Sequence, residues 1–186
     1  MAYPARGRDP FLDAGTKAFI EKRGREIIGL LLIVAGVFLA LMIGSYSSED
    51  AAWLVSGDAS VNNWMGRTGA TIAAPLVKIL GFGSWALPLV SIAWGVRMVL
   101  HNGLDRMFNR VMYAPIFMAV YAIYCATLTP DASWLHTFSM GGQFGDTVLL
   151  LLVKVVPGSA GFGVNLLSVI FGVLTFALGL FVCGVT

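Results

Sequence analysis

Residues Ile27–Tyr46 read IIGLLLIVAGVFLALMIGSY, an unbroken run without a charged side chain. An α-helix needs about 17–25 apolar residues to cross the roughly 30 Å hydrocarbon core of a bilayer. Three more uncharged runs follow, at Ile79–Val96, at Val111–Leu128 and from Val155 to the last residue, Thr186. The chain is 58% hydrophobic and 12% charged, whereas soluble domains have about 25% charged residues. We therefore expect an all-α integral membrane protein.

Four spans are predicted, at about residues 27–46, 79–98, 111–128 and 161–183. The positive charges indicate their orientation. Half of the 12 lysines and arginines precede the first span, and others flank the connection between the second and third. The stretches directly after the first and third spans, Ser47–Met65 and Thr129–Gly145, carry none. By the positive-inside rule, the basic tail of residues 1–24 and, after four crossings, the C-terminus lie in the cytoplasm.

The two halves of the chain share motifs in the same order. The motif Asp50-Ala51-Ala52-Trp53 corresponds to Asp131-Ala132-Ser133-Trp134, and Gly66-x-x-Gly69-x-Thr71 corresponds to Gly142-x-x-Gly145-x-Thr147. We expect two parallel repeats, together forming residues 25–186. Each repeat would consist of a span, an outer connection, a short apolar helix and a returning span.

The short apolar helices are predicted at about residues 69–80 and 146–156. Each is too short to cross a bilayer, and runs of this length are typical of interfacial or re-entrant segments. Each contains one lysine, Lys78 or Lys154. On the outer side of the membrane, these lysines would extend their ammonium groups toward water.

Motifs of catalysis and ligand binding are missing from the sequence. It has no G-x-x-x-x-G-K-[ST] phosphate loop, no G-x-S-x-G nucleophile motif and no histidine or cysteine set at metal-ligand spacing. We predict no catalytic, cofactor-binding or metal residue. A small four-span transporter or channel subunit is the alternative, although the four uncharged runs contain no acidic residue or histidine for an ion path.

Small residues recur on one face of the first span and one face of the last. Such small-x-x-x-small patterns let helix backbones approach closely in lipid. They fit packing within one bundle, or contact between neighbouring subunits. The candidate packing residues are Gly29, Gly36, Ala40, Gly44, Gly172 and Gly179.

Tryptophans cluster in the two outer connections. They fit an aromatic belt at the membrane interface, or an outward binding surface, since aromatic side chains dominate many protein contacts. Acidic residues and asparagines accompany them. The candidate partner-contact residues are Asp50, Trp53, Asn62, Asn63, Trp64, Arg67, Asp131 and Trp134.

The ordered motifs of the first half resemble a known family. They are Arg25-Glu26-Ile27-Ile28-Gly29, Asn62-Asn63-Trp64-Met65-Gly66-Arg67, Gly81-Phe82-Gly83, Leu87-Pro88 and Trp94-Gly95. They resemble the N-terminal four-span membrane domain of the FtsK/SpoIIIE family of bacterial DNA translocases. The similarity extends over about residues 20–183.

The resemblance implies a membrane anchor and scaffold at the division septum of the bacterial inner membrane, in contact with lipid and with other cell-division membrane proteins. In this family a hexameric cytoplasmic motor pumps DNA. ATP, magnesium and DNA would therefore bind to the motor and not to these residues. Hexamer formation would likewise take place through the motor. The chain stops directly after its last span, so we expect a piece of a longer protein.

Overall fold

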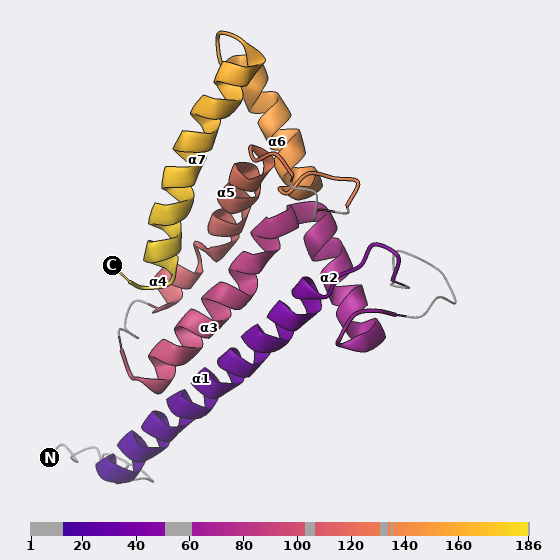
Figure 1. The fold of residues 1–186 in the computed structure, drawn as a ribbon. Helices are drawn as coiled ribbons and strands as arrows, with labels where there is room; N and C mark the ends of the chain where they lie inside the picture. Colours follow the sequence, from indigo (N-terminus) through magenta and orange to yellow (C-terminus); the bar gives the residue numbers. More distant parts are fainter. Residues whose placement is uncertain (1–12, 51–60, 103–106, 131–133, 135, 186) are drawn as a thin grey trace, which may run out of the picture.

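The computed structural model describes residues 13–50, 61–102, 107–130, 134 and 136–185. All regular elements within these residues are helical, which confirms the predicted all-α class (Figure 1). In chain order they are α1 (Ala14–Gly44), α2 (Gly66–Leu80), the 3-10 helix η1 (Gly81–Trp85), α3 (Ala86–Val99), α4 (Met107–Val111), α5 (Ala114–Ala126), α6 (Gly142–Val155) and α7 (Ala160–Val182).

Among the described residues, three helical stretches are long and apolar enough to cross a membrane: Gly15–Gly44, Gly66–Val99 and Ala160–Val182. They contain three of the four predicted spans. The remaining one corresponds to α5, which has 13 residues and is shorter than the roughly 17 that a perpendicular crossing needs. The four-span topology therefore stays a prediction.

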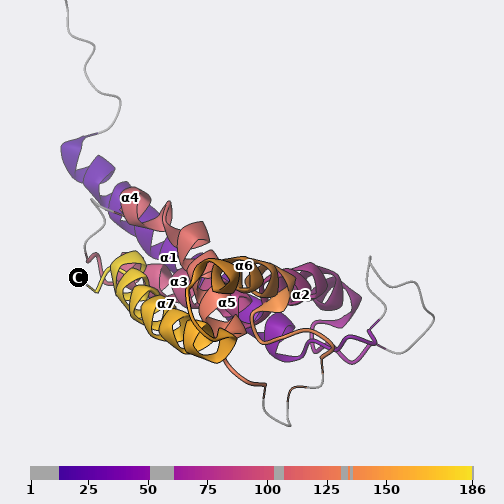
Figure 2. The ribbon, with the colours of Figure 1, turned by 90° about the horizontal axis from the view of Figure 1, so that it is seen from above.

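The helices form two similar groups. In the first, α1 packs against α3, while α2 and α3 meet at η1 in an inverted V (Figure 1). In the second, α5 packs against α7, while α6 and α7 form another inverted V. The view from above shows α5 and α6 in the middle of the molecule (Figure 2). The start of α1, α4 and the C-terminus lie on the left in both views.

Both short helices begin earlier than predicted, because each starts at a glycine with a left-handed backbone. Gly66 opens α2 with φ +63°, and Gly142 opens α6 with φ +68°. The Gly66 N–H donates to the Asn63 carbonyl at 2.8 Å, and the Gly142 N–H donates to the Ser139 carbonyl at 3.0 Å. The two turns therefore have the same local geometry, as a repeat would require.

The contact between α1 and α3 is a close backbone crossing. A Cβ atom added at Gly29 would lie 2.7 Å from the Gly95 carbonyl oxygen, and one at Gly95 would lie 2.6 Å from the Gly29 oxygen. Trp94, the residue before Gly95, is buried and donates from its indole nitrogen to the Val182 carbonyl at 2.7 Å. That hydrogen bond ties the end of α7 to the first group of helices.

Candidate functional site

The predicted partner-contact residues of the first half surround the connection from α1 to α2, where Asp50 is the organising residue. Its side chain is buried, with 2% of its surface exposed. One carboxylate oxygen accepts the Asn62 N–H at 2.7 Å, and the other accepts the Asn63 N–H at 3.0 Å. Hydrogen bonds to a charged group contribute about 1.5–3 kcal/mol each. Asp50 therefore holds the start of the connection against its end, at Asn62 and Asn63.

Asn63 fastens the returning chain to the end of α1. Its amide nitrogen donates to the Met42 carbonyl at 2.8 Å, and its amide oxygen accepts the Met65 N–H at 3.1 Å. The last carbonyls of a helix have no partner within the helix, so the Asn63 amide supplies one. Ser45 adds a third tie, because its hydroxyl oxygen accepts the Trp64 N–H at 3.1 Å.

The prediction that Asp50 and Asn63 contact a partner is therefore corrected: both side chains make contacts within the chain. The sequence suggested a binding surface for both, but their polar atoms are used within the chain and both side chains are buried. Trp53 and Asp131 lie outside the described residues.

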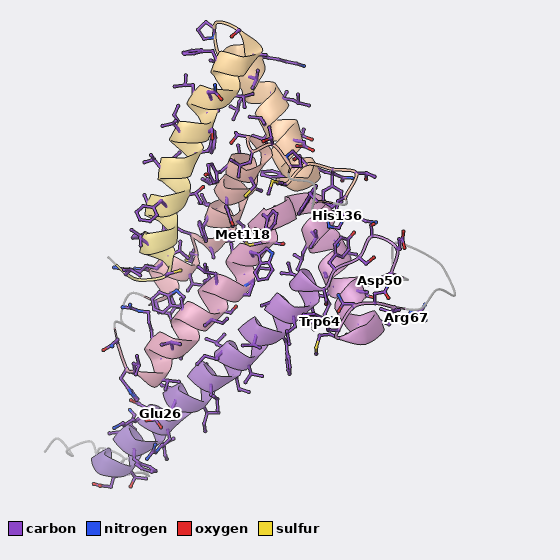
Figure 3. All side chains as sticks on the ribbon, viewed as in Figure 1. Glu26, Asp50, Trp64, Arg67, Met118 and His136 are labelled. Carbon is purple, nitrogen blue, oxygen red and sulfur yellow. The ribbon has the colours of Figure 1, made fainter. Side chains whose placement is uncertain are left out.

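Three of the predicted residues remain accessible: Asn62, Trp64 and Arg67. The Trp64 indole is 73% exposed, although its backbone is held by Ser45. Trp64 and Arg67 lie beside the start of α2 (Figure 3). We call these three residues the Trp64 surface. A large exposed aromatic ring on an ordered backbone loses little conformational entropy on binding, which suits a contact with another protein.

Trp134, the predicted counterpart in the second half, is partly buried in an aromatic cluster formed by Tyr46, Phe82, Trp134, His136 and Phe138. The Trp134 ring stacks on Phe82 at 5.0 Å between centroids and meets His136 edge-on at 4.6 Å. Its indole nitrogen donates to the Phe138 carbonyl at 2.6 Å. The second connection thus folds over residues of the first helical group.

The sequence singled out only Trp134 of this cluster as a candidate contact residue, and His136 is its one ionisable ring with a shifted pKa near neutrality. Its ring stacks on Phe138 at 5.2 Å and lies 5.2 Å from the Tyr46 ring. Burial lowers the pKa of His136 below its ordinary value, because the imidazolium form would lose water. The alternation of aromatic rings at residues 134, 136 and 138 was the available signal.

The predicted packing glycines face other elements of the same chain. Gly29 and Gly36 lie against α3, Gly172 approaches the Tyr124 ring and Gly179 approaches the Phe117 ring. A Cβ at Gly44 would make an ordinary contact with Trp85, at 3.5 Å. Ala40 lines a groove between α1 and α3. Gly29 and Gly36 are therefore buried between helices, whereas Ala40, Gly172 and Gly179 are partly exposed and Gly44 is exposed.

Within the described part of the chain, no three His, Cys, Asp or Glu side chains are grouped so that they could hold a metal ion.

Comparison with known proteins agrees with this architecture. A family model described as the 4TM region of DNA translocase FtsK/SpoIIIE matches residues 21–186. The DNA translocase FtsK of Azospirillum brasilense is 30% identical over 156 residues, which are 83% of this chain and 25% of that protein. Its namesake in Mesorhizobium japonicum is 24% identical over 162 residues, covering 86% of this chain and 18% of the relative.

The chain spans a quarter or less of the length of these curated relatives. No solved structure matches it. The family match extends over most of the chain and includes every helix except the first residues of α1. The chain therefore belongs to the family of 4TM membrane regions of the DNA translocases FtsK and SpoIIIE.

Proposed function

We propose that this chain is the membrane anchor and division-site targeting domain of a larger DNA translocase. It would cross the bacterial inner membrane four times, as two parallel repeats, with both termini in the cytoplasm. The observation that carries the proposal is the match of the 4TM family model across residues 21–186 of an apolar helical chain. Because the chain spans only a quarter or less of its relatives, DNA pumping and ATP hydrolysis would belong to other parts of such a protein.

The exposed apolar surface supports the anchoring role. On α7, the side chains of Val169, Val173 and Phe176 are each more than 60% exposed. In water such a face would be strongly unfavourable, whereas lipid tails solvate it. A bundle with several spans resists extraction far better than a single lipid anchor, which binds only marginally. It suits a domain that must hold against the reaction force of a motor.

The distribution of basic residues supports the orientation. Arg23 and Arg25 lie near the start of α1, and Arg97 lies in the last turn of α3. Arg110 of α4 lies over the Phe181 ring near the end of α7, 5.2 Å from its centroid. These elements share one side of the molecule (Figure 1). By the positive-inside rule that side would be cytoplasmic.

Single-cysteine labelling tests the topology. In a background with Cys125→Ala and Cys183→Ala, the exposed positions Asn62 and Asn102 are each changed to cysteine. A membrane-impermeant maleimide added to intact cells should label Asn62→Cys, and should label Asn102→Cys only after the membrane is opened. Labelling of Asn102→Cys in intact cells would refute the proposed orientation.

Localisation tests targeting separately. A fluorescent fusion of this chain should concentrate at the division septum of dividing cells. Uniform fluorescence around the membrane would refute targeting and leave anchoring intact. If the Trp64 surface contacts a division protein, Trp64→Ala with Arg67→Ala should reduce septal enrichment several-fold. Thr68→Ala, an exposed change on the same helix, should leave it unchanged.

A further inference from the structure

A partly open cavity lies where the end of α1 meets η1 and the aromatic cluster. Its volume is about 160 Å³, and aromatic rings form most of its wall: Tyr46, Phe82, Trp85, Trp134 and His136. We call it the aromatic cavity. No lysine, arginine or carboxylate among the described residues lines it. The anchor function leaves this cavity without a role.

The surroundings of the aromatic cavity favour a cation. The faces of aromatic rings attract ammonium and guanidinium groups, most strongly where water is excluded. Ile43 and Gly44, the last residues of α1, also line the cavity. A helix C-terminus carries a partial negative charge, which many helices balance with a basic residue in the last turn. Helices α2, α3, α4 and α6 have such a residue, whereas α1, α5 and α7 have none, and of these three only α1 ends at the aromatic cavity.

A second, larger groove adjoins the aromatic cavity and shares Phe82 and Trp85 with it. It has a volume of about 620 Å³ and runs between α1, α3 and α5. Its wall is apolar, with Ala40, Leu89 and Phe117 among its lining residues. The size falls within the range of about 300–1,000 Å³ that is usual for ligand sites. We call it the apolar groove.

We propose that the aromatic cavity and the apolar groove together bind one membrane phospholipid whose head group carries an ammonium. The ammonium occupies the aromatic cavity, beside the end of α1, and an acyl chain follows the apolar groove. A cationic side chain of another protein would satisfy the cavity alone. A lipid has a group for each space, and the two spaces have Phe82 and Trp85 as common lining residues, which favours the lipid as the occupant.

Native mass spectrometry of the whole chain in detergent micelles tests this site on the unaltered protein. The probes are phosphatidylethanolamine and phosphatidylglycerol with identical acyl chains, supplied in equal amounts. The protein should retain the ammonium lipid about fivefold or more over the anionic one, as expected for a desolvated cation among aromatic rings. Equal retention of the two lipids, or preference for phosphatidylglycerol, would overturn the proposal.

Variants assign the preference to the cavity. The double variant Tyr46→Leu with Trp134→Leu should bring the retention ratio close to one, whereas Trp134→Phe, which keeps a ring, should preserve most of it. The control Trp64→Leu removes an exposed tryptophan that lines neither space, and it should leave the lipid retention ratio unchanged. Filling the groove with Ala93→Phe should reduce retention of both lipids. A ratio unchanged in the Tyr46 and Trp134 double variant would overturn the assignment.

A further arm separates the lipid from a protein ligand. N-acetylarginine amide, added to the protein at millimolar concentration, should displace little phosphatidylethanolamine, because it lacks a chain for the apolar groove. Binding of this guanidinium probe, measured by tryptophan fluorescence, together with absence of lipid retention would overturn the lipid as occupant. None of these outcomes bears on the topology or the localisation of the domain.

Discussion

Asp50 shows how one residue organises a connection in this protein. A carboxylate avoids water only where hydrogen-bond donors replace the lost hydration. Here two consecutive backbone N–H groups, those of Asn62 and Asn63, occupy its two oxygens. The neighbouring Glu49 is exposed. The two acidic residues are adjacent in sequence, and only one supports the fold.

Replacement of Asp50 by alanine should destabilise the protein by about 1.5–3 kcal/mol, because one buried and one partly buried N–H group lose a charged acceptor. Reversible unfolding in mixed micelles of dodecylmaltoside and SDS measures the loss. The matched control, Glu49→Ala, should change the unfolding free energy by less than about 0.5 kcal/mol. Equal effects of the two substitutions would contradict the role of Asp50.

The partly buried His136 ring predicts a dependence of stability on pH. Its pKa in the folded chain is lowered by burial, whereas in the unfolded chain it is about 6.5. Below pH 6.5 the unfolded state therefore binds more protons, and stability is lost as the pH falls. Above pH 6.5 the contribution is complete. Unfolding between pH 7.5 and 5 should show this loss, and His136→Gln should remove it, whereas His101→Gln should not.

At the scale of whole elements, the α1–α3 pair is stabilised by backbone proximity. The glycines at the crossing leave each carbonyl close to the opposite helix, so a single added methyl group has no room. In lipid, helices associate through such close packing because no water is released when their apolar faces meet. Gly24, on the same helix, faces open space with nothing within 4 Å of its Cβ position.

Two substitutions of glycine by alanine on α1 should therefore act in opposite directions. Gly24→Ala should stabilise the protein by about 0.5–1 kcal/mol, since alanine has the higher helix propensity. Gly29→Ala should destabilise it by about 1–3 kcal/mol, because the new methyl group meets the Gly95 carbonyl. The same micelle unfolding assay compares them. Stabilisation by both would show that α1 and α3 are farther apart than the structure has them.

At the scale of the molecule, the two helical groups are joined where Gly81 meets Gly142. The Phe82 N–H donates to the Met140 carbonyl at 2.8 Å across this seam. A Cβ added at Gly142 would lie 2.5 Å from the Gly81 nitrogen and 2.6 Å from the Ile79 carbonyl oxygen. Gly66, its counterpart in the first group, has the same left-handed backbone but nothing within 4 Å.

Substitutions at Gly66 and Gly142 distinguish the cost of backbone strain from the cost of disturbing the contact between the groups. Gly66→Ala should cost about 1 kcal/mol, the strain of a left-handed alanine. Gly142→Ala carries the same strain and also forces two backbones apart, so it should cost at least about 2 kcal/mol more. Limited proteolysis should then cleave between the groups in Gly142→Ala first. Equal stability of the two variants would contradict the seam.

Much of this protein follows from its sequence. Long uncharged stretches need a solvent of lipid and the helix that satisfies every backbone group within one segment, so the all-α membrane class was predictable. The residues of the α1–α3 crossing, Gly29 and Gly36, were recognisable from their spacing for the same local reason. Hydropathy and helical periodicity are properties of neighbouring residues and need no knowledge of the fold.

The tertiary structure decided the roles of the polar and aromatic residues in the connections. The sequence suggested the same partner-contact role for Asp50, Asn62, Asn63 and Trp64. Of these residues only Asp50 and Asn63 are buried. The role of His136 depends on the second connection folding over the end of α1, where the His136 ring contacts Tyr46. The hydrogen bonds that Asp50 accepts from residues 12 and 13 positions away, and the ring contacts between the two groups, depend on how the chain closes in space. Contacts between residues far apart in the sequence cannot be predicted from the local composition around each of them.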